Sequence, residues 1–294
     1  MLFKPKENSW IAKNSDKIIQ DVNEIRNIKE SKIVFDLSEM AWFHPFGLSM
    51  LAGLILLCLR KGKKCEIKMP RGKNIRKYLE AIGFNKILGL SDKTYKGFQG
   101  LSSKLQLQWL ESKNSYLARR IVDVFNRELS MSEEVQGSLV TSIQEMMNNA
   151  LDHSESHIGC LASAQTFKES RQIRACLVDF GIGIKKSLEK NPKWKDFIND
   201  DLEAIQLAFK SGVSSLQGSR GLGLAMLEEF LSVNEGELTV TSGEVTFNKV
   251  YKKKAAEVSF WDNCMLEGTA IEITVRTDKR GLYALSDQEG DYLF

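Results

Sequence analysis

Four polar side chains in the middle of the chain have a spacing that could bind a metal or move a proton. A helix is expected from about Ser132 to Asp152, and it would place these side chains on one face, because residues three and four apart are neighbours on a helix. They are Glu145, Asn148, Asn149 and Asp152. A carboxylate one turn from an amide oxygen would set a general base beside a ligand for a hard cation. The alternative is an ordinary solvated face.

An acidic residue and two glycines follow a predicted strand. The strand covers residues 173–178 and runs into Asp179, Gly181 and Gly183. Glycine lacks a side chain, so it lets a ligand approach the backbone closely. Alone, this spacing is a weak indication of a binding site.

A second glycine turn, residues 218–223, contains Arg220, Gly221 and Gly223 and opens an apolar helix over 224–231. The first N–H groups of a helix suit phosphate groups. A Rossmann fingerprint would need a strand directly before the glycines, whereas a polar loop precedes them here. No Walker A sequence occurs in the chain.

Hydrophobic periodicity predicts the elements that must position these residues. The helix that carries Glu145 has a core-facing stripe, which consists of Val135, Leu139, Ile143, Met146, Met147 and Ala150. A helical pattern is also expected over 105–129, and the stretch 184–217 suits a mobile lid. Gly268 and Thr269 begin a strand in which apolar and polar residues alternate.

The first 90 residues predict a small α/β domain. In order, we expect a strand at 31–37, a turn at 44–47, an apolar helix to 59, a strand at 65–69 and an amphipathic helix at 75–82. Glycine, serine and lysine are frequent after residue 90, so we expect a linker over 91–110. A second domain would cover 111–280, and an extended tail 281–294.

The glycine turns and the polar helix face together resemble the sequence boxes of the GHKL superfamily. This superfamily includes gyrase B, heat-shock 90-type chaperones, histidine kinases, MutL and anti-sigma-factor serine kinases. Its boxes are matched in order by Glu145-x-x-x-Asn149, Asp179-x-Gly181-x-Gly183, Gly221-x-Gly223 and Gly268-Thr269. The resemblance implies a Bergerat fold, an α/β sandwich in which a mixed sheet is backed by helices and ATP lies between a helix and a lid.

The same resemblance implies a role for each matched residue. Glu145 would orient or deprotonate the attacking water or hydroxyl, and Asn149 would coordinate Mg²⁺ together with the phosphates of ATP. Asp179 would accept a hydrogen from the adenine amino group, with support from Thr269. The remaining matches would serve close approach of the backbone to the nucleotide, with Arg220 reaching a phosphate or facing solvent; they are Gly181, Gly183, Gly221 and Gly223.

The N-terminal domain resembles the STAS domain of anti-sigma-factor antagonists. The resemblance covers Ile33 to Leu90, and its turn, which in the family usually reads Asp-Ser-Ser-Gly, is here His44-Pro45-Phe46-Gly47. Phe46 stands at the position of the phosphorylated serine. Because Phe46 has no hydroxyl group, this position cannot accept a phosphoryl group.

Composition excludes several classes of protein. The charge is nearly balanced, with 41 Lys and Arg against 38 Asp and Glu, so no global field favours nucleic acid. The five cysteines are odd in number and form no CxxC pair, which argues against a disulfide framework or a zinc ribbon. No apolar stretch suits a membrane span or a secretory signal, and we expect a cytoplasmic protein.

Two classes of enzyme remain. The favoured one is an ATP-dependent switch with slow Mg²⁺-dependent hydrolysis, which changes how a protein partner or a second copy binds. The alternative is a serine/threonine kinase like the anti-sigma factors, with STAS-like or sigma-factor-like regulators as partners. A histidine kinase is disfavoured, because His44, His153 and His157 do not occupy a dimerisation helix ahead of the ATP domain. A non-enzymatic ATP-binding scaffold would have no need of Glu145.

Overall fold

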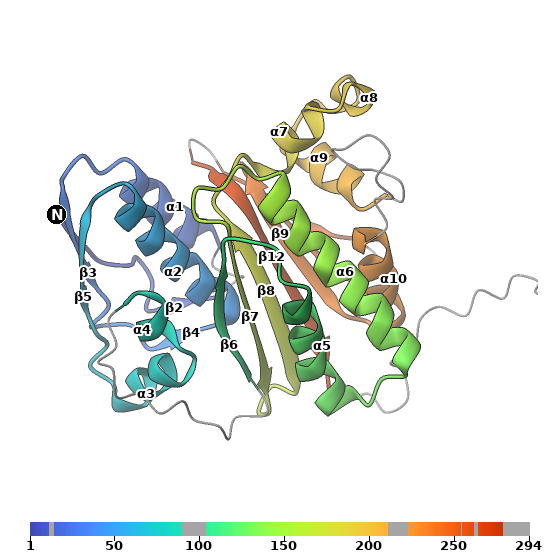
Figure 1. Ribbon diagram of the computed structural model, residues 1–294, viewed down its shortest axis with the longest axis horizontal. Helices are drawn as coiled ribbons and strands as arrows, with labels where there is room; N and C mark the ends of the chain where they lie inside the picture. The colour runs from blue at the N-terminus through green and yellow to red at the C-terminus, as the bar shows by residue number, and fades with distance from the viewer. Residues whose placement is uncertain (12–14, 90–103, 211–222, 254, 262–263, 279–294) are drawn as a thin grey trace, which may run out of the picture.

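The chain folds into alternating layers of sheet and helix, so its fold is α/β, as the sequence predicts (Figure 1). The computed structural model describes residues 1–11, 15–89, 104–210, 223–253, 255–261 and 264–278. A small sheet, a helical layer, a large sheet and a second helical layer follow one another across the molecule. Within the described residues, no helix combines the length and the apolar character needed to cross a membrane.

The small sheet is built from three parallel strands in the order β1 (Leu2–Phe3), β3 (Lys32–Asp36), β5 (Lys64–Lys68). Helix α2 (Pro45–Arg60) lies between this sheet and the large one (Figure 1). Every residue from Pro45 to Cys58 is buried, because a helix that is apolar on all sides needs neighbours on all sides. The other elements of this part are β2 (Ser9–Trp10), α1 (Ser15–Arg26), β4 (Trp42–Phe43), α3 (Lys73–Ala81) and α4 (Phe84–Ile87).

The large sheet has seven strands, in the order β11-β10-β9-β12-β8-β7-β6, and each neighbouring pair is antiparallel. The prediction of a mixed sheet, with both parallel and antiparallel pairs, is therefore wrong. Short hairpins join β7 to β8 and β9 to β10, and a hairpin reverses the direction of the chain. The strands are β6 (Lys104–Leu110), β7 (Cys160–Phe167), β8 (Gln172–Asp179), β9 (Glu237–Gly243), β10 (Val245–Val250), β11 (Glu257–Phe260) and β12 (Leu266–Arg276).

The outer face of the large sheet is covered by α5 (Ser115–Leu129), α6 (Glu133–Asp152) and α10 (Gly223–Val233) (Figure 1). The predicted core stripe of α6 is confirmed, since all six of its residues are buried. Three short helices stand at one end of the sheet. They are α7 (Gly183–Glu189), α8 (Pro192–Lys195) and α9 (Asp201–Ala208).

The large sheet separates two hydrophobic cores, and alternate residues of its strands enter different cores. Along β8, Cys176 and Val178 pack with α2, and Phe180 just beyond the strand does the same. Ala175 and Leu177 pack instead with α5, α6 and α10. The first 90 residues therefore share a core with the sheet that carries the predicted site.

The predicted start of the helix over 105–129 is wrong. Residues 104–110, expected to be linker or the beginning of a helix, form edge strand β6, and α5 begins at Ser115. The pairing of β6 with β7 shifts between Leu105 and Gln108, which places Leu105 in one core and Leu107 in the other. This irregularity interrupts the simple alternation by which a strand is recognised. Residues 90–103 and the tail at 281–294 lie outside the described residues.

Candidate functional site

Helix α6 brings three polar residues to one pocket. The helix begins at a capping residue, Ser132, whose hydroxyl accepts a hydrogen bond from the Val135 amide at 3.3 Å. Further along, Glu145, Asn149 and His153 follow one another at four-residue spacing and line the pocket. Eight residues of helix span about 12 Å, so these side chains extend along its wall.

The other two members of the predicted polar face are not among the residues that line the pocket. Asn148 accepts a hydrogen bond from the Gln144 side chain at 3.1 Å. Asp152 forms an ion pair with Lys113 at 2.7 Å. For these two residues, the solvated-face interpretation is the better one.

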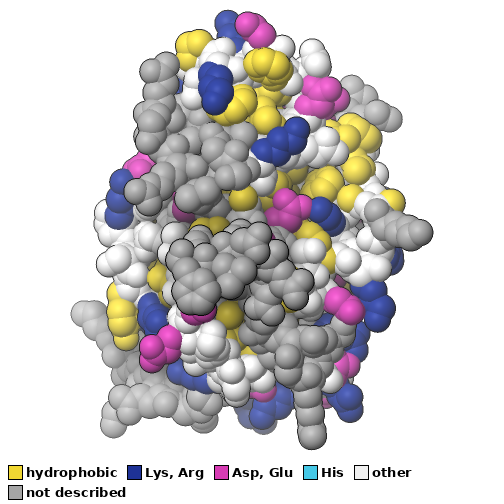
Figure 2. Space-filling view, turned by 90° about the vertical axis from the view of Figure 1, so that its right-hand side faces the viewer, with side chains coloured by type: hydrophobic (Ala, Val, Ile, Leu, Met, Phe, Trp, Pro, Cys, Tyr) yellow, Lys and Arg dark blue, Asp and Glu magenta, His cyan; other side chains and the backbone are white. Residues whose placement is uncertain are grey.

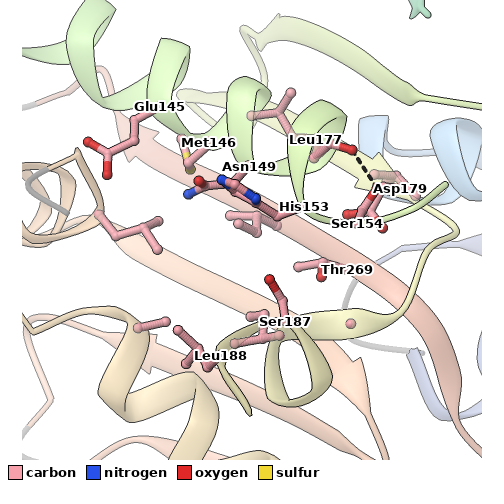
Figure 3. A pocket seen from close by; sticks show the side chains of 17 residues that line it. Glu145, Met146, Asn149, His153, Ser154, Leu177, Asp179, Ser187, Leu188 and Thr269 are labelled. Atoms are coloured by element: carbon pink, nitrogen blue, oxygen red, sulfur yellow. Dashed lines mark hydrogen bonds between the residues drawn. The ribbon is translucent and has the colours of Figure 1, made fainter. Parts of the chain in front are cut away.

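The pocket lies between α6 and α7, on the outer face of the large sheet (Figure 3). Its free internal space is about 100 Å³, and about 10–15 Å³ of such space holds one water molecule. The pocket can therefore admit part of a larger ligand. Its apolar lining includes Met146, Ile184, Leu188, Ala208, Leu224 and Ile271.

Asp179 stands at the end of the pocket opposite Glu145, with Asn149 and His153 between them (Figure 3). Its carboxylate accepts hydrogen bonds from the backbone amides of Gly181, at 2.9 Å, and Thr269. Burial raises the pKa of Asp179 to about 7, and these two amides offset part of that rise. The group can therefore gain or lose a proton near neutral pH.

Thr269 lies beside Asp179 because β12 pairs with β8 in the register that sets these two residues opposite each other. Just before it, Gly268 has a φ of 130°, a conformation that L side chains rarely adopt. A Cβ at Gly268 would lie 2.2 Å from the Asp179 carbonyl oxygen. The glycine thus allows β12 to approach the end of β8 closely.

The glycines after Asp179 also serve packing within the protein. A Cβ at Gly181 would lie 1.9 Å from the carbonyl oxygen of Ser154, which accepts a hydrogen bond from the Ile182 amide at 2.6 Å. Gly183 has a φ of 81° and lines the pocket, whereas Gly181 is not among the lining residues. Gly181 therefore fits the loop against the end of α6.

The region expected to be a lid is helical over much of its described part. Ser187 and Leu188 of α7, with Ala208 of α9, face the pocket. Gly223 is the first residue of α10, and Leu224 lines the pocket beside it. Arg220 and Gly221 lie outside the described residues.

Sequence reasoning missed three polar residues that line the pocket. They are His153, Ser154 and Ser187. His153 follows Asn149 at the four-residue spacing that had singled out Glu145, so the same pattern could have found it. Burial lowers the pKa of His153, which favours the neutral imidazole. His157, four residues further along the chain, is exposed and is not among the lining residues.

The turn at 44–47 lies on the other face of the large sheet. Phe46 is fully buried, and its amide donates to the carboxylate of Glu272 at 3.4 Å. Glu272 also forms a buried ion pair with Arg174 at 2.7 Å. The neighbour of Glu272 in β12, Ile271, lines the pocket, and neighbouring strand residues point to opposite faces. The sheet thus separates Phe46 from the pocket.

The pocket offers two kinds of chemistry at its two ends. At the end of the pocket near Glu145, the carboxylate of Glu145 and the amide oxygen of Asn149 could orient water and share a hard cation with an anionic ligand. At the other end, a buried carboxylate could accept a hydrogen bond from a ligand with a polar N–H group. In the described part of the chain, no three His, Cys, Asp or Glu side chains gather as metal ligands.

On the side of the molecule that carries α6 and α10, basic side chains are interspersed with acidic ones (Figure 2).

Comparisons with known proteins add no family: no family model matches the chain, and a search of curated proteins finds no match.

Proposed function

We propose that the pocket binds ATP and that the protein is a nucleotide-dependent switch for a protein partner, with slow Mg²⁺-dependent hydrolysis. One observation carries this proposal. Glu145, Asn149, Asp179, Gly183 and Thr269, which the sequence boxes single out across residues 145–269, line a single pocket. They come from three parts of the chain, namely α6, the segment from the end of β8 to the start of α7, and β12.

The resemblance to GHKL proteins supplies the proposed fold names. We assign the large sheet with α5, α6 and α10 to a Bergerat-type domain, although its strands are all antiparallel in the described pairs. The first 90 residues, with their parallel sheet and buried helix α2, are proposed to be STAS-like.

At the enclosed end of the pocket, Asp179 is proposed to hold the adenine base. Its carboxylate already accepts the amides of Gly181 and Thr269, and a carboxylate has about four acceptor positions. The remaining positions can accept a hydrogen from the adenine amino group. Apolar side chains such as Ile271 and Met146 suit the faces of a flat ring.

At the opposite end of the pocket, Glu145 and Asn149 are proposed to act on the phosphates of ATP. The amide oxygen of Asn149 would share Mg²⁺ with phosphate oxygens, and the ion would neutralise their charge. Glu145, one helical turn away, would orient a water molecule and accept its proton. His153 lies between these residues and Asp179 (Figure 3).

The position of Phe46 bears on the choice between a switch and a kinase. Phe46 has no hydroxyl group and lies behind the sheet, against Glu272. A kinase of this design would therefore need an acceptor other than Phe46, such as a serine of a separate protein. The switch needs no such acceptor, and for that reason we prefer it.

Following the fate of the γ-phosphate tests this choice. The protein is incubated with γ-labelled ATP and Mg²⁺, alone and with lysate of its source, and the label is followed into free phosphate or protein. The switch predicts free phosphate and no labelled protein. Label on a STAS-like protein would favour the kinase, and label on His153 or His157 would favour a histidine kinase.

Glu145→Ala is the informative variant in this assay. We expect it to retain ATP binding and to lose turnover by about 10²–10⁴-fold, the range for a lost general base. Glu134→Ala is the matched control, because Glu134 is an exposed residue of the same helix and is not among those that line the pocket. Unchanged turnover in Glu145→Ala would remove the catalytic role.

A further inference from the structure

Helix α2 of the N-terminal part contacts Phe180, the residue that directly follows Asp179 at the end of β8. Gly53, in the middle of α2, faces the ring of Phe180 so closely that an added Cβ would lie 2.3 Å from Phe180 Cε2. The same Cβ would lie 3.0 Å from Leu161 Cδ1 of β7. Phe180 is 4% exposed and belongs to the core around α2. The glycine therefore makes room for this ring.

Phe180 directly follows Asp179, and the two side chains serve opposite faces of the sheet. Asp179 lines the pocket, whereas Phe180 packs toward α2. The backbone at Asp179 is confined on a second side by β12, where Gly268 leaves no room for a Cβ beside the Asp179 carbonyl oxygen. A shift of the Phe180 ring would therefore move the backbone that holds the Asp179 carboxylate.

We propose that Gly53 and Phe180 are positioning residues, through which α2 sets the position of the Asp179 carboxylate and hence how strongly the pocket distinguishes the adenine amino group. This inference rests on the proposed ATP function. It adds that the N-terminal part helps to determine the ligand selectivity of a pocket on the opposite face of the sheet.

The test compares ATP with purine riboside triphosphate, which lacks the amino group at position 6. Calorimetric titration gives both affinities for the same protein. A hydrogen bond to a charged group predicts that the wild type prefers ATP by roughly ten- to a hundredfold. General damage to the fold lowers both affinities together, whereas a displaced Asp179 lowers the preference itself.

Gly53→Ala should bring the ratio of the affinity for ATP to that for purine riboside triphosphate toward one, because the new Cβ displaces the Phe180 ring. Adding Phe180→Leu to this variant should restore much of the preference, since leucine lacks the Cε2 atom that the Cβ would meet. Gly137→Ala is the matched control. Gly137 lies on the exposed side of α6 with nothing within 4 Å of an added Cβ, and its preference should equal that of the wild type.

If Gly53→Ala does not fold, as judged by circular dichroism, Phe180→Leu alone serves as the second variant. It loosens the contact with α2 and should lower the preference for ATP to a smaller extent. If the wild type prefers ATP and the variants that fold show the same preference, this inference is overturned and the proposed function is not affected. Failure of the wild type to bind either nucleotide would overturn the proposed function, and this inference with it.

Discussion

Two buried carboxylates of the large sheet have different surroundings. Glu272 is paired with Arg174 at 2.7 Å, so its charge is compensated within the protein. Asp179 accepts backbone amides, and burial raises its pKa to about 7. Burying a carboxylate without a cation costs free energy, and perturbed groups of this kind cluster at functional sites. This contrast makes Asp179 a group that a ligand could use.

The raised pKa of Asp179 predicts how the stability of the ligand-free protein depends on pH. The ordinary pKa of 3.8 applies to the unfolded chain, and the folded value is about 7. The stability that the protonated group contributes is therefore fully present below about pH 4 and is lost as the pH rises to about 7. Asp179→Asn has no such loss. The melting temperature of this variant minus that of the wild type should therefore increase between about pH 4 and pH 7 and remain constant above pH 7.

Thermal melts of both proteins at several pH values check this expectation. The pH dependence of other groups, including Glu272, is common to the two proteins and cancels in the difference. Parallel curves for the two proteins between pH 4 and 7 would contradict a raised pKa at Asp179.

At the level of elements, the loop after β8 connects Asp179 to α7 and lies against the end of α6 at Gly181. A Cβ added to Gly181 would lie 1.9 Å from the carbonyl oxygen of Ser154, just beyond the end of α6. Gly181→Ala should therefore push this loop away from α6 and lower the melting temperature. Overpacking of this kind typically costs about 1–3 kcal/mol. ATP affinity should fall as well, because Asp179 is two residues away.

Gly137→Ala is again the comparison for Gly181→Ala. Alanine is a better helix former than glycine by about 1 kcal/mol, and Gly137 has open space around it, so this variant should be slightly stabilised. A Gly181→Ala protein that is as stable as Gly137→Ala would show that the loop does not need its close contact with α6.

The sequence predicted α6 well, because a long periodic helix depends mainly on its own residues. It predicted β6 poorly, because the irregular pairing between Leu105 and Gln108 depends on β7. The sequence predicted that Gly181 lets a ligand approach the backbone, whereas in the structure the atoms nearest to an added Cβ there belong to Ser154. That Gly181 approaches Ser154 is a property of the folded chain, and no local pattern contains it.

At the level of the whole molecule, the N-terminal part and the large sheet share one hydrophobic core. One core contains Phe46 and Leu54 of α2 together with Val178 and Ala270 of the large sheet. Polar contacts join the same parts, since Ser49 and Ser163 share a hydrogen bond at 3.1 Å. Separation would expose the apolar surface of α2 that the large sheet covers.

This shared core predicts one cooperative unfolding transition. Differential scanning calorimetry should give a single peak, with a calorimetric enthalpy equal to the van't Hoff enthalpy. A fragment of residues 1–90 should fail to give a cooperative transition. Two resolved transitions in the full chain would show that the two parts fold independently and that the contact between α2 and the large sheet is weak.

Calorimetric titration with ATP, with Mg²⁺ and then in EDTA, tests the central claim most directly. The proposed function predicts binding to one site per chain and a marked loss of affinity in EDTA, because Asn149 would share Mg²⁺ with the phosphates. Equal affinity in the two buffers would contradict the metal role of Asn149. If ATP does not bind in either buffer, the pocket between α6 and α7 is not a nucleotide site.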